Sequence, residues 1–522
     1  MFVVSMYWNM KRILFTFFVL VAVAASLQAE DKVIRRVLEL GRTDNRVMQH
    51  DDILANVIGG RPVGSHNLED AERWAIETFK SMGLEVMIQE VGEAPVGFGR
   101  GPWSGRMLAA DGMILHFGTP TYTAGTKGIQ RGHVVLEPKT TEEFERMKTV
   151  LKGAWVLLES RSDGAVLDCS AEADQRRARI IAENDSLSKL NDAIFFYNRT
   201  HSDKKELHKL KKDPVLFYRQ MVEAGVLGFI QAAPVPIRCL ADRANFKNFT
   251  WDNLPKVCDI KLDEHQFAII RQKVLEFQDV ILEFDIRNHF FIGPVKYRNI
   301  IGVMRGSKYP KEYVMMGGHL DSYDIAGGAV DDGNGASVVI EAARLLSSCG
   351  AKPKRTILFC LWTGEEYGLL GSKFFVENKT VPIENISNYF NRDGGPTAAS
   401  SITVPEAMYD DFVKVAAPVA DYTPGIPFTV RKREGPARPR PKQAGGSDHA
   451  PFQMEGGAAL SFSCTDPLGY NFKYGEIWHT ENDVYNKVIP VYMEHSAVVT
   501  AVIAYGIANL DHLLARDGLY SD

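Results

Sequence analysis

The stretch EYVMMGGHLDSYDIAGGAVDDGNGASVVIEAARLL, Glu312 to Leu346, decides the fold expected of this chain. It begins as an apolar strand that runs into a glycine turn, and its end, DDGNGASVVIEAARLL, opens a helix. This order places His319 and Asp321 at the carboxyl end of the strand and Asp331 in the loop just before the helix. Open α/β sheets hold their active sites at the carboxyl ends of their strands. These three polar residues are therefore the first candidates for a functional site.

The same arrangement returns further along the chain. RTILFCLWTGEEYGLLGSKFF contains a buried strand over residues 356–362, a turn, and then Glu365 and Glu366 before the next helix. ISNYFNRDGGP delivers Asp393 after another apolar run, and YGEIWHTENDVYNKV delivers His479 in a loop ahead of a C-terminal helix. Strands that alternate with helices in this way predict an α/β fold, with a mostly parallel sheet covered by helices on both faces.

Two histidines and several carboxylates thus arrive at the loop ends of one predicted sheet. Such a donor set suits two zinc ions or related divalent metals. A carboxylate that bridges two metals needs two free oxygens, and Asp331 is the candidate for that position. His319 and Asp393 then complete one ion, and Glu366 and His479 complete the other. Two ions about 3.5–4 Å apart can polarise a substrate carbonyl and activate a water molecule.

Two further residues have predicted catalytic roles. Glu365, beside the metals but not bound to them, can take the proton of the water and pass it to the leaving amine. Asp321 can accept the second imidazole proton of His319 and so fix the ligand tautomer. Each residue alone also has a structural interpretation as a helix cap, a partner of the helix dipole or an ordinary polar residue. For Asp324 and Asp332 we expect only such cap or turn roles.

At this point the sequence resembles the co-catalytic di-zinc exopeptidases, which include bacterial leucyl aminopeptidases, glutamate carboxypeptidase and the transferrin receptor. The resemblance rests on GGHLDS, GAVDDGNGA, LWTGEEYGLLGS, NRDGG, GGSDHAPF and HTENDV, in that order. It implies metal ligation by the first histidine, the bridging aspartate, the second glutamate, the later aspartate and the final histidine: His319, Asp331, Glu366, Asp393 and His479. It implies that Glu365 is the general base.

GSKYP, GGHLDSYD, PKRTILFCLWTGEE and GSHNLEDA look most similar to the carboxypeptidase Q (plasma glutamate carboxypeptidase) branch of that family. That resemblance implies an inserted protease-associated domain. The sequence between Gly118 and Arg287 agrees with such an insert, because its pattern changes there to short predicted strands that alternate with charge-rich helical segments. We therefore expect peptidase segments at residues 30–117 and 288–522, the latter with the catalytic site, and the insert at residues 118–287.

The first 29 residues have the pattern of a secretory signal peptide. A basic Lys11-Arg12 pair precedes the apolar run from Ile13 to Ala25, and Leu27-Gln28-Ala29 forms a cleavage site. The alternative is a membrane anchor that is kept, but the run is shorter than the roughly 20 residues of a membrane span. The sequence therefore predicts a periplasmic or extracellular protein with no stable membrane insertion after cleavage.

Several residues are candidates for binding the substrate. The basic, proline-rich loop from Val430 to Gln443 contains Arg438 and Arg440, whose guanidinium groups match the geometry of a carboxylate. The alternative is a solvated surface loop, since runs of charge usually face water. The other candidates are Asp448 and His449 of SDHAPF, with helix capping as the alternative, and Tyr470 or Tyr474 as oxyanion stabilisers, with core packing as the alternative.

Composition limits the class of function. The chain has 522 residues, 45% hydrophobic and 24% charged, with a formal net charge of −5, which gives no reason to expect a nucleic-acid partner. Its six cysteines include no CxxC pair, and a role as small buried hydrophobic residues competes with disulfide pairing.

The sequence predicts an exported metallo-exopeptidase with two zinc ions that acts on short peptides or dipeptides. One alternative is a glutaminyl cyclase, which uses a similar scaffold with one zinc. A second is a non-catalytic receptor, although a receptor has no need of the general base. The sequence leaves open the choice between aminopeptidase, carboxypeptidase and dipeptidase, the side-chain preference, the native metal, the disulfide connectivity and whether the protein forms a homodimer.

Overall fold

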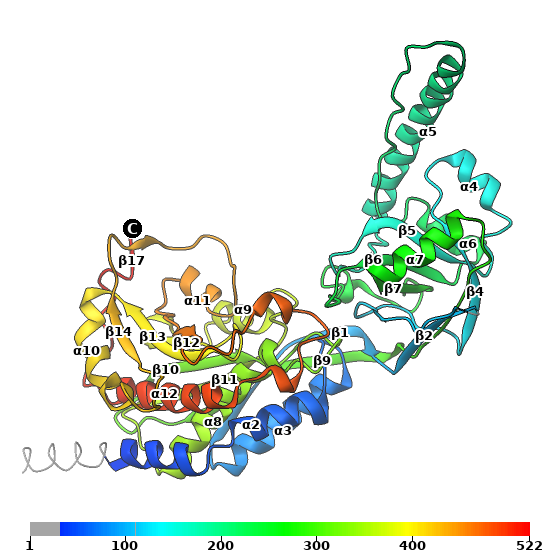
Figure 1. Ribbon diagram of the computed structural model, residues 1–522. Helices are drawn as coiled ribbons and strands as arrows, with labels where there is room; N and C mark the ends of the chain where they lie inside the picture. Colours follow the sequence, from blue (N-terminus) through cyan, green and yellow to red (C-terminus); the bar gives the residue numbers. More distant parts are fainter. Residues whose placement is uncertain (1–31, 110, 522) are drawn as a thin grey trace, which may run out of the picture.

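The computed structural model describes residues 32–109 and 111–521 as two bodies, each built on its own sheet (Figure 1). The predicted signal peptide lies outside the described residues. The two long strands β1 (Glu85–Gly99) and β9 (His289–Met304) pair antiparallel and run from one body to the other. The helices α2 (Val47–Asp52) and α3 (His66–Ser81) precede β1, and residues 32–43 are also helical.

A five-stranded sheet organises the first body. Its strand order is β1-β9-β11-β10-β12, where the last three strands are β10 (Tyr309–His319), β11 (Arg355–Trp362) and β12 (Ile386–Asn391). Strand β10 runs parallel to both β11 and β12, whereas β9 is antiparallel to both β1 and β11. Four of its five strands therefore run in one direction and β9 runs in the other, so the sheet is mixed and mostly parallel, as the sequence predicts. The reversed strand β9 pairs with β1 as a long antiparallel ribbon, whose strands lack the helical crossover that parallel neighbours require.

The alternation of side chains along β11 explains why helices cover both faces of this sheet. Ile357, Phe359 and Leu361 belong to one buried cluster, which also contains side chains of α3, α8 (Asn334–Ser348) and α12 (Pro490–Asn509). Leu358, Cys360 and Trp362 belong to a second cluster with α9 (Leu370–Glu377) and α11 (Ala450–Met454). Every residue of β11 is buried, as expected for a strand with helices on each side.

A seven-stranded sheet organises the second body. Its strand order is β2-β8-β4-β5-β6-β7-β3, with bounds β2 Trp103–Leu108, β3 Phe117–Gly118, β4 Gln130–Leu136, β5 Trp155–Arg161, β6 Gly228–Ala233, β7 Cys258–Asp263 and β8 Ile281–Ile286. Its helices are α4 (Thr141–Met147), α5 (Ala171–Thr200), α6 (Tyr218–Ala224) and α7 (Glu264–Leu275). The chain leaves the first sheet at Gly99 and returns to it at His289. Strand β2 therefore lies in the second body, although it precedes Gly118, the expected start of the insert.

The C-terminal part of the first body adds a small sheet and a long buried helix. Strands β14 (Thr429–Lys432), β13 (Ala398–Val404) and β16 (Ser463–Thr465) form the small sheet, next to α10 (Glu406–Ala416). A second pair joins β15 (Arg438–Pro439) to β17 (Tyr520–Ser521). Helix α12 is long and apolar enough to span a membrane, but 89% of that stretch is buried inside the protein. It is packed here as a core helix.

All six cysteines are free thiols in this structure, and four of them, Cys239, Cys258, Cys349 and Cys360, are buried. Cys360 packs in the cluster beneath α9 and α11, and Cys349 packs in the main core. These buried thiols act as small hydrophobic side chains.

Candidate metal centre

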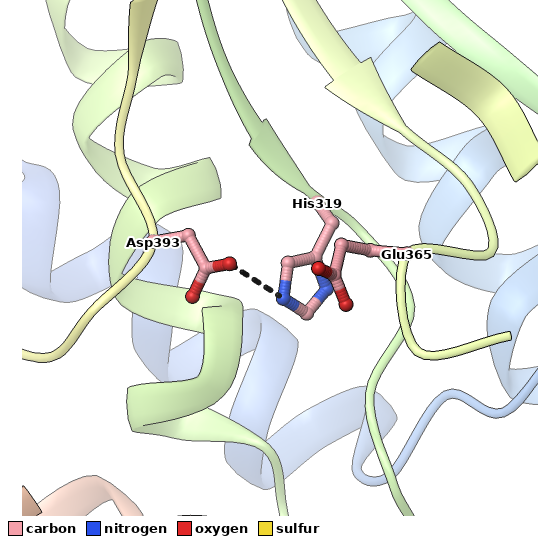
Figure 2. A group of neighbouring side chains, drawn as sticks. All are labelled: His319, Glu365 and Asp393. Carbon is pink, nitrogen blue, oxygen red and sulfur yellow. Dashed lines mark ion pairs between the residues drawn. The ribbon is translucent and has the colours of Figure 1, made fainter. Parts of the chain in front are cut away.

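The predicted donors lie at one edge of the five-stranded sheet. His319 is the last residue of β10, and Glu365 and Asp393 follow the ends of the neighbouring strands β11 and β12. Because these three strands are parallel, their carboxyl ends meet at the same edge. Figure 2 shows the side chains of His319, Glu365 and Asp393 directed toward one another, with Asp393 Oδ2 3.9 Å from His319 Nε2.

The carboxylate of Asp331 lies between two imidazole rings. Its Oδ1 is 3.2 Å from Nε2 of His319, and its Oδ2 is 3.3 Å from Nε2 of His479. Nε2 of His479 also lies 3.1 Å from Oε2 of Glu366. One oxygen of Asp331 thus faces each histidine, which is the placement that a carboxylate shared by two cations requires.

Two overlapping groups of donors meet the distance requirement for a metal ion. Ligand atoms of His319, Glu365 and Asp393 lie within 4.8 Å of one another, and so do those of His319, Asp331 and Glu366. The other oxygen of Glu366, Oε1, is buried without a hydrogen-bond partner. A buried carboxylate oxygen without a donor is costly unless a cation lies beside it. The residues present therefore fit divalent metal ions of the class that binds imidazole and carboxylate.

The side chain of Asp332 links the end of β10 to the start of α8 through hydrogen bonds. One of its carboxylate oxygens accepts the backbone N–H of His319 and the other accepts the backbone N–H of Gly335, both at 3.0 Å. A Cβ atom at position 335 would lie 2.2 Å from the carbonyl oxygen of Arg392, so only glycine allows this close approach. The neighbouring aspartates thus have separate roles, since Asp331 faces the histidines and Asp332 holds the backbone.

Asp321 contacts the site differently from the sequence-based expectation. Nδ1 of His319 lies 2.8 Å from the backbone carbonyl oxygen of Asp321 but 3.7 Å from the nearer carboxylate oxygen. The carboxylate instead accepts the backbone N–H groups of Glu365 and Glu366, at 3.1 and 3.3 Å. Asp321 therefore orients His319 through its backbone and holds the Glu365–Glu366 loop through its side chain.

The crowding of carboxylates in a buried space shifts their pKa values. Burial raises the pKa of Glu365 to about 11, and the charges of Asp393, Asp448 and Glu366 add to this effect while His319 opposes it. Burial alone would lower the pKa of His479, but the charges of Glu366 and Asp331 outweigh it and raise the pKa to about 9. Without metal ions, the site thus retains protons to limit its negative charge. Divalent cations would remove that need.

A cavity of about 550 Å³ opens onto these donors. Of the candidate substrate-binding residues, His449 and Tyr474 line it. Burial raises the pKa of Tyr474, and nearby carboxylates such as Asp331 raise it further, so its hydroxyl stays protonated.

The other candidate substrate-binding residues are not among those that line the cavity. Asp448 is fully buried and its carboxylate accepts the hydroxyl of Ser372 at 2.5 Å. Tyr470 is 57% exposed and packs against Tyr492. Arg438 and Arg440 are exposed at or beside β15.

Two cations that the sequence analysis missed line the same cavity: Arg243 and Lys373. Lys373 donates to the carbonyl oxygen of Gly368 at 2.8 Å. The guanidinium of Arg243 has no hydrogen-bond or ion-pair partner among residues 32–109 and 111–521. Arg243 comes from a loop of the second body, more than 70 residues before the first metal-ligand candidate. Nothing in its local sequence distinguishes it from a surface arginine.

The second body also contacts the loop that contains His479. The backbone N–H of Cys239 donates to the carbonyl oxygen of His479 at 3.4 Å, and the guanidinium of Arg238 lies 4.8 Å from the ring centre of Trp478. Glu481 pairs with His116 at 2.6 Å. The position of His479 therefore depends on both bodies.

Comparisons with known proteins agree with this arrangement. Residues 299–504 match the model of peptidase family M28. The chain is 24% identical to carboxypeptidase Q of mouse and of human, in each case over 93% of this chain and 90% of the relative. It shares its fold with a peptidase M28 precursor from Shewanella amazonensis (TM-score 0.56, 18% identity, 93% of this chain and 98% of the other).

It also shares its fold with a zinc aminopeptidase from Bacillus subtilis (TM-score 0.51, 15% identity, 91% of this chain and 97% of the other). The chain therefore fits the co-catalytic zinc exopeptidase family, as its motifs predict, and these matches support a metallo-exopeptidase.

Proposed function

We propose that this metallo-exopeptidase is exported and uses two zinc ions to hydrolyse a terminal peptide bond of short peptides or dipeptides. The observation that carries the proposal is the carboxylate of Asp331, with one oxygen facing His319 and the other facing His479. Asp393 would join His319 on one ion, and Glu366 would join His479 on the other. Export rests on the signal-peptide pattern of the first 29 residues.

Bound zinc would supply Lewis acidity, which polarises the substrate carbonyl and makes the attacking water more acidic. The protein's own groups then move the proton. Glu365 takes it from the water and delivers it to the nitrogen of the leaving amine as the peptide bond breaks. The backbone N–H of Glu365 donates to the carboxylate of Asp321, which holds the backbone of Glu365 in place. The Glu365 carboxylate therefore approaches the water from a fixed direction. Tyr474 donates its hydroxyl proton toward the carbonyl oxygen that becomes negative.

Arg243 and Lys373 give the cavity a preference for substrates with a free carboxylate. The forked guanidinium of Arg243 matches a carboxylate in two parallel hydrogen bonds, whereas Lys373 offers a point charge. The cavity volume of about 550 Å³ suits a short peptide rather than a folded protein.

In this proposal the second body is a protease-associated-like insert at about residues 100–288. It limits the length of the substrate because it contributes Arg243 to one wall of the cavity. A homodimer remains part of the proposal, and the mass of the purified protein in solution would test it.

The proposal is tested by removing the metal with a chelator, restoring it with zinc, and following hydrolysis of free and end-blocked dipeptides. We expect activity to disappear and return with zinc, and the metal content to approach two ions per chain. Glu365→Gln should lose about 10²–10⁴-fold in kcat while it retains its metal. Unchanged activity after chelation, or near-normal turnover of metal-loaded Glu365→Gln, would refute the mechanism.

Arg243→Ala separates the substrate preference from the chemistry. It should raise KM for dipeptides with a free carboxylate and leave amidated dipeptides unaffected. Release of ammonia from an N-terminal glutamine peptide, with one zinc per chain, would instead indicate a glutaminyl cyclase.

A further inference from the structure

A long arm extends from the second body away from both sheets (Figure 1). We define the arm as helix α5, Ala171–Thr200, together with the returning segment 201–212. Thirty helical residues span about 45 Å. Only Ala173, Arg177 and Asn184 of this helix are buried, so its outer half has no hydrophobic core behind it. Something other than core packing must hold the returning segment in place.

Three asparagines fasten the returning segment to the helix at intervals of seven residues. Asn184, Asn191 and Asn198 each donate their amide N–H to a backbone carbonyl oxygen and accept a backbone N–H from the same residue, at 2.7–3.0 Å. The partner residues are Lys211, His208 and Lys205, which are three residues apart. Seven helical residues rise about 10.5 Å, and three extended residues cover about the same length. The two repeats therefore stay in register, and the arm has one defined conformation.

The outer part of the arm exposes apolar side chains. Phe195 and Phe196, in the last two turns of the helix, are 54% and 65% exposed, and Leu190 and Leu207 are also exposed. Leu207 lies in the returning segment next to His208, which is fastened to Asn191. Exposed apolar side chains that gather at one place on a surface are typical of an interaction site, whereas single exposed ones are ordinary.

The outer part of the arm carries a net positive charge. Residues 186–212 contain seven Lys or Arg and three Asp or Glu, a formal charge of +4, in a chain whose total is −5. The cations Lys204 and Lys205 lie in the turn that follows the helix, close in sequence to the aromatic end. Aromatic rings surrounded by lysines are the combination that binds the surface of an anionic bilayer, where the rings enter the interface and the cations contact the headgroups.

We infer that the arm docks the protein onto an anionic lipid surface, with Phe195 and Phe196 entering the headgroup region and the surrounding lysines contacting lipid phosphates. An acidic protein would match the charge equally well, but it would not account for two exposed rings at the outermost part of the helix. The inference does not depend on the proposed function, because no residue of the arm lines the metal cavity.

The test is flotation of the full-length, metal-loaded protein with vesicles of phosphatidylcholine alone or of phosphatidylcholine with phosphatidylglycerol. We expect binding only to the anionic vesicles, with a loss of binding in high salt. Lys189 and Lys209 are two exposed cations of residues 186–212. The double variant Phe195→Ser/Phe196→Ser and the double variant Lys189→Glu/Lys209→Glu should each weaken binding by at least about ten-fold. Hydrolysis of a soluble dipeptide should be unchanged in both, which reports an intact fold.

The matched control is Phe277→Ser, because Phe277 is 97% exposed on the second body but lies outside the arm. It should bind vesicles as the wild type does. Failure of the wild type to bind anionic vesicles would overturn the inference. A loss of binding in the lysine variant with normal binding in the phenylalanine variant would overturn it as well, since that result describes a purely electrostatic surface such as one for an acidic protein.

Discussion

Replacing Asp321 by asparagine tests whether the Asp321 carboxylate positions the catalytic loop. Its two oxygens accept the backbone N–H groups of Glu365 and Glu366, and asparagine keeps only one acceptor oxygen. The other N–H would then face an NH₂ group. Loss of one hydrogen bond to a charged acceptor costs about 1.5–3 kcal/mol, and a buried donor without a partner costs about 1–3 kcal/mol. The variant should therefore lose roughly 2.5–6 kcal/mol of unfolding free energy if the two costs add.

The effect on turnover should be larger than a general loss of stability explains. Asp321 holds the residues predicted to bind one metal and to move the proton, and such supporting groups are worth about 10–100-fold in metal affinity or activity. The assay is kcat/KM on a dipeptide at saturating zinc and at a temperature where the variant is folded, with the metal content measured on the same sample. The backbone carbonyl of Asp321 still accepts from His319, so that ligand should remain in place.

Asp324→Asn is the matched control, because Asp324 is also a buried aspartate and lies three residues away. Its carboxylate accepts hydrogen bonds from Arg100 at 2.7 Å and from Thr121 at 2.5 Å, not from the backbone N–H groups of Glu365 and Glu366. Breaking a buried ion pair costs about 3–5 kcal/mol, so the two variants should lose similar stability. Only Asp321→Asn should lose turnover. Near-normal kcat/KM in folded, metal-loaded Asp321→Asn, or an equal loss in Asp324→Asn, would refute the positioning role.

Three other predictions concern the fold. Burial lowers the pKa of His495 to about 4, whereas a histidine in the unfolded chain has a pKa near 6.5. The neutral His495 side chain therefore contributes its full share of stability above pH 6.5. That share, about 3 kcal/mol at most, is lost as the pH falls toward 4. Urea unfolding at about pH 6.5 and about pH 4 should show that the free energy of unfolding falls less between these two pH values in His495→Gln than in the wild type. Phe359→Ala should cost about 3–5 kcal/mol in the same unfolding assay, because Phe359 is fully buried at the centre of the first sheet; a smaller loss would mean that the core collapses around the gap. Asn191→Ala should leave activity intact and speed tryptic cleavage after Lys204 or Lys205, because the variant loses the hydrogen bonds that tie His208 to the helix. An unchanged cleavage rate would contradict the proposed role of Asn184, Asn191 and Asn198 in holding the returning segment.

Local sequence determined the elements that meet at the candidate metal centre. An apolar run followed by glycine and a polar residue predicts a strand end, and strands of one parallel set end at the same edge. His319, Asp393 and the Glu365–Glu366 pair could be placed together on that reasoning alone. The sequence also indicated that helices cover both faces of β11, because its apolar residues run without interruption.

Pairing between distant segments could not be obtained in this way. The antiparallel partnership of β1 and β9 joins strands separated by the whole second body, so no local pattern reports it. The separate roles of the Asp321 carboxylate and carbonyl likewise depend on where the loop after β11 comes to lie.

What the sequence by itself determined is the donor chemistry of this protein, since residue types and their positions after strands depend on short stretches of chain. Only the tertiary structure decided which other residues surround those candidate metal ligands. It brings Arg243 from the second body to the cavity, leaves Arg438 and Arg440 outside it, and aligns three asparagines with a returning segment. The physical reason is that side chains far apart in sequence meet only after the chain has closed its long loops. The local spacing of residues does not indicate which distant segments come together.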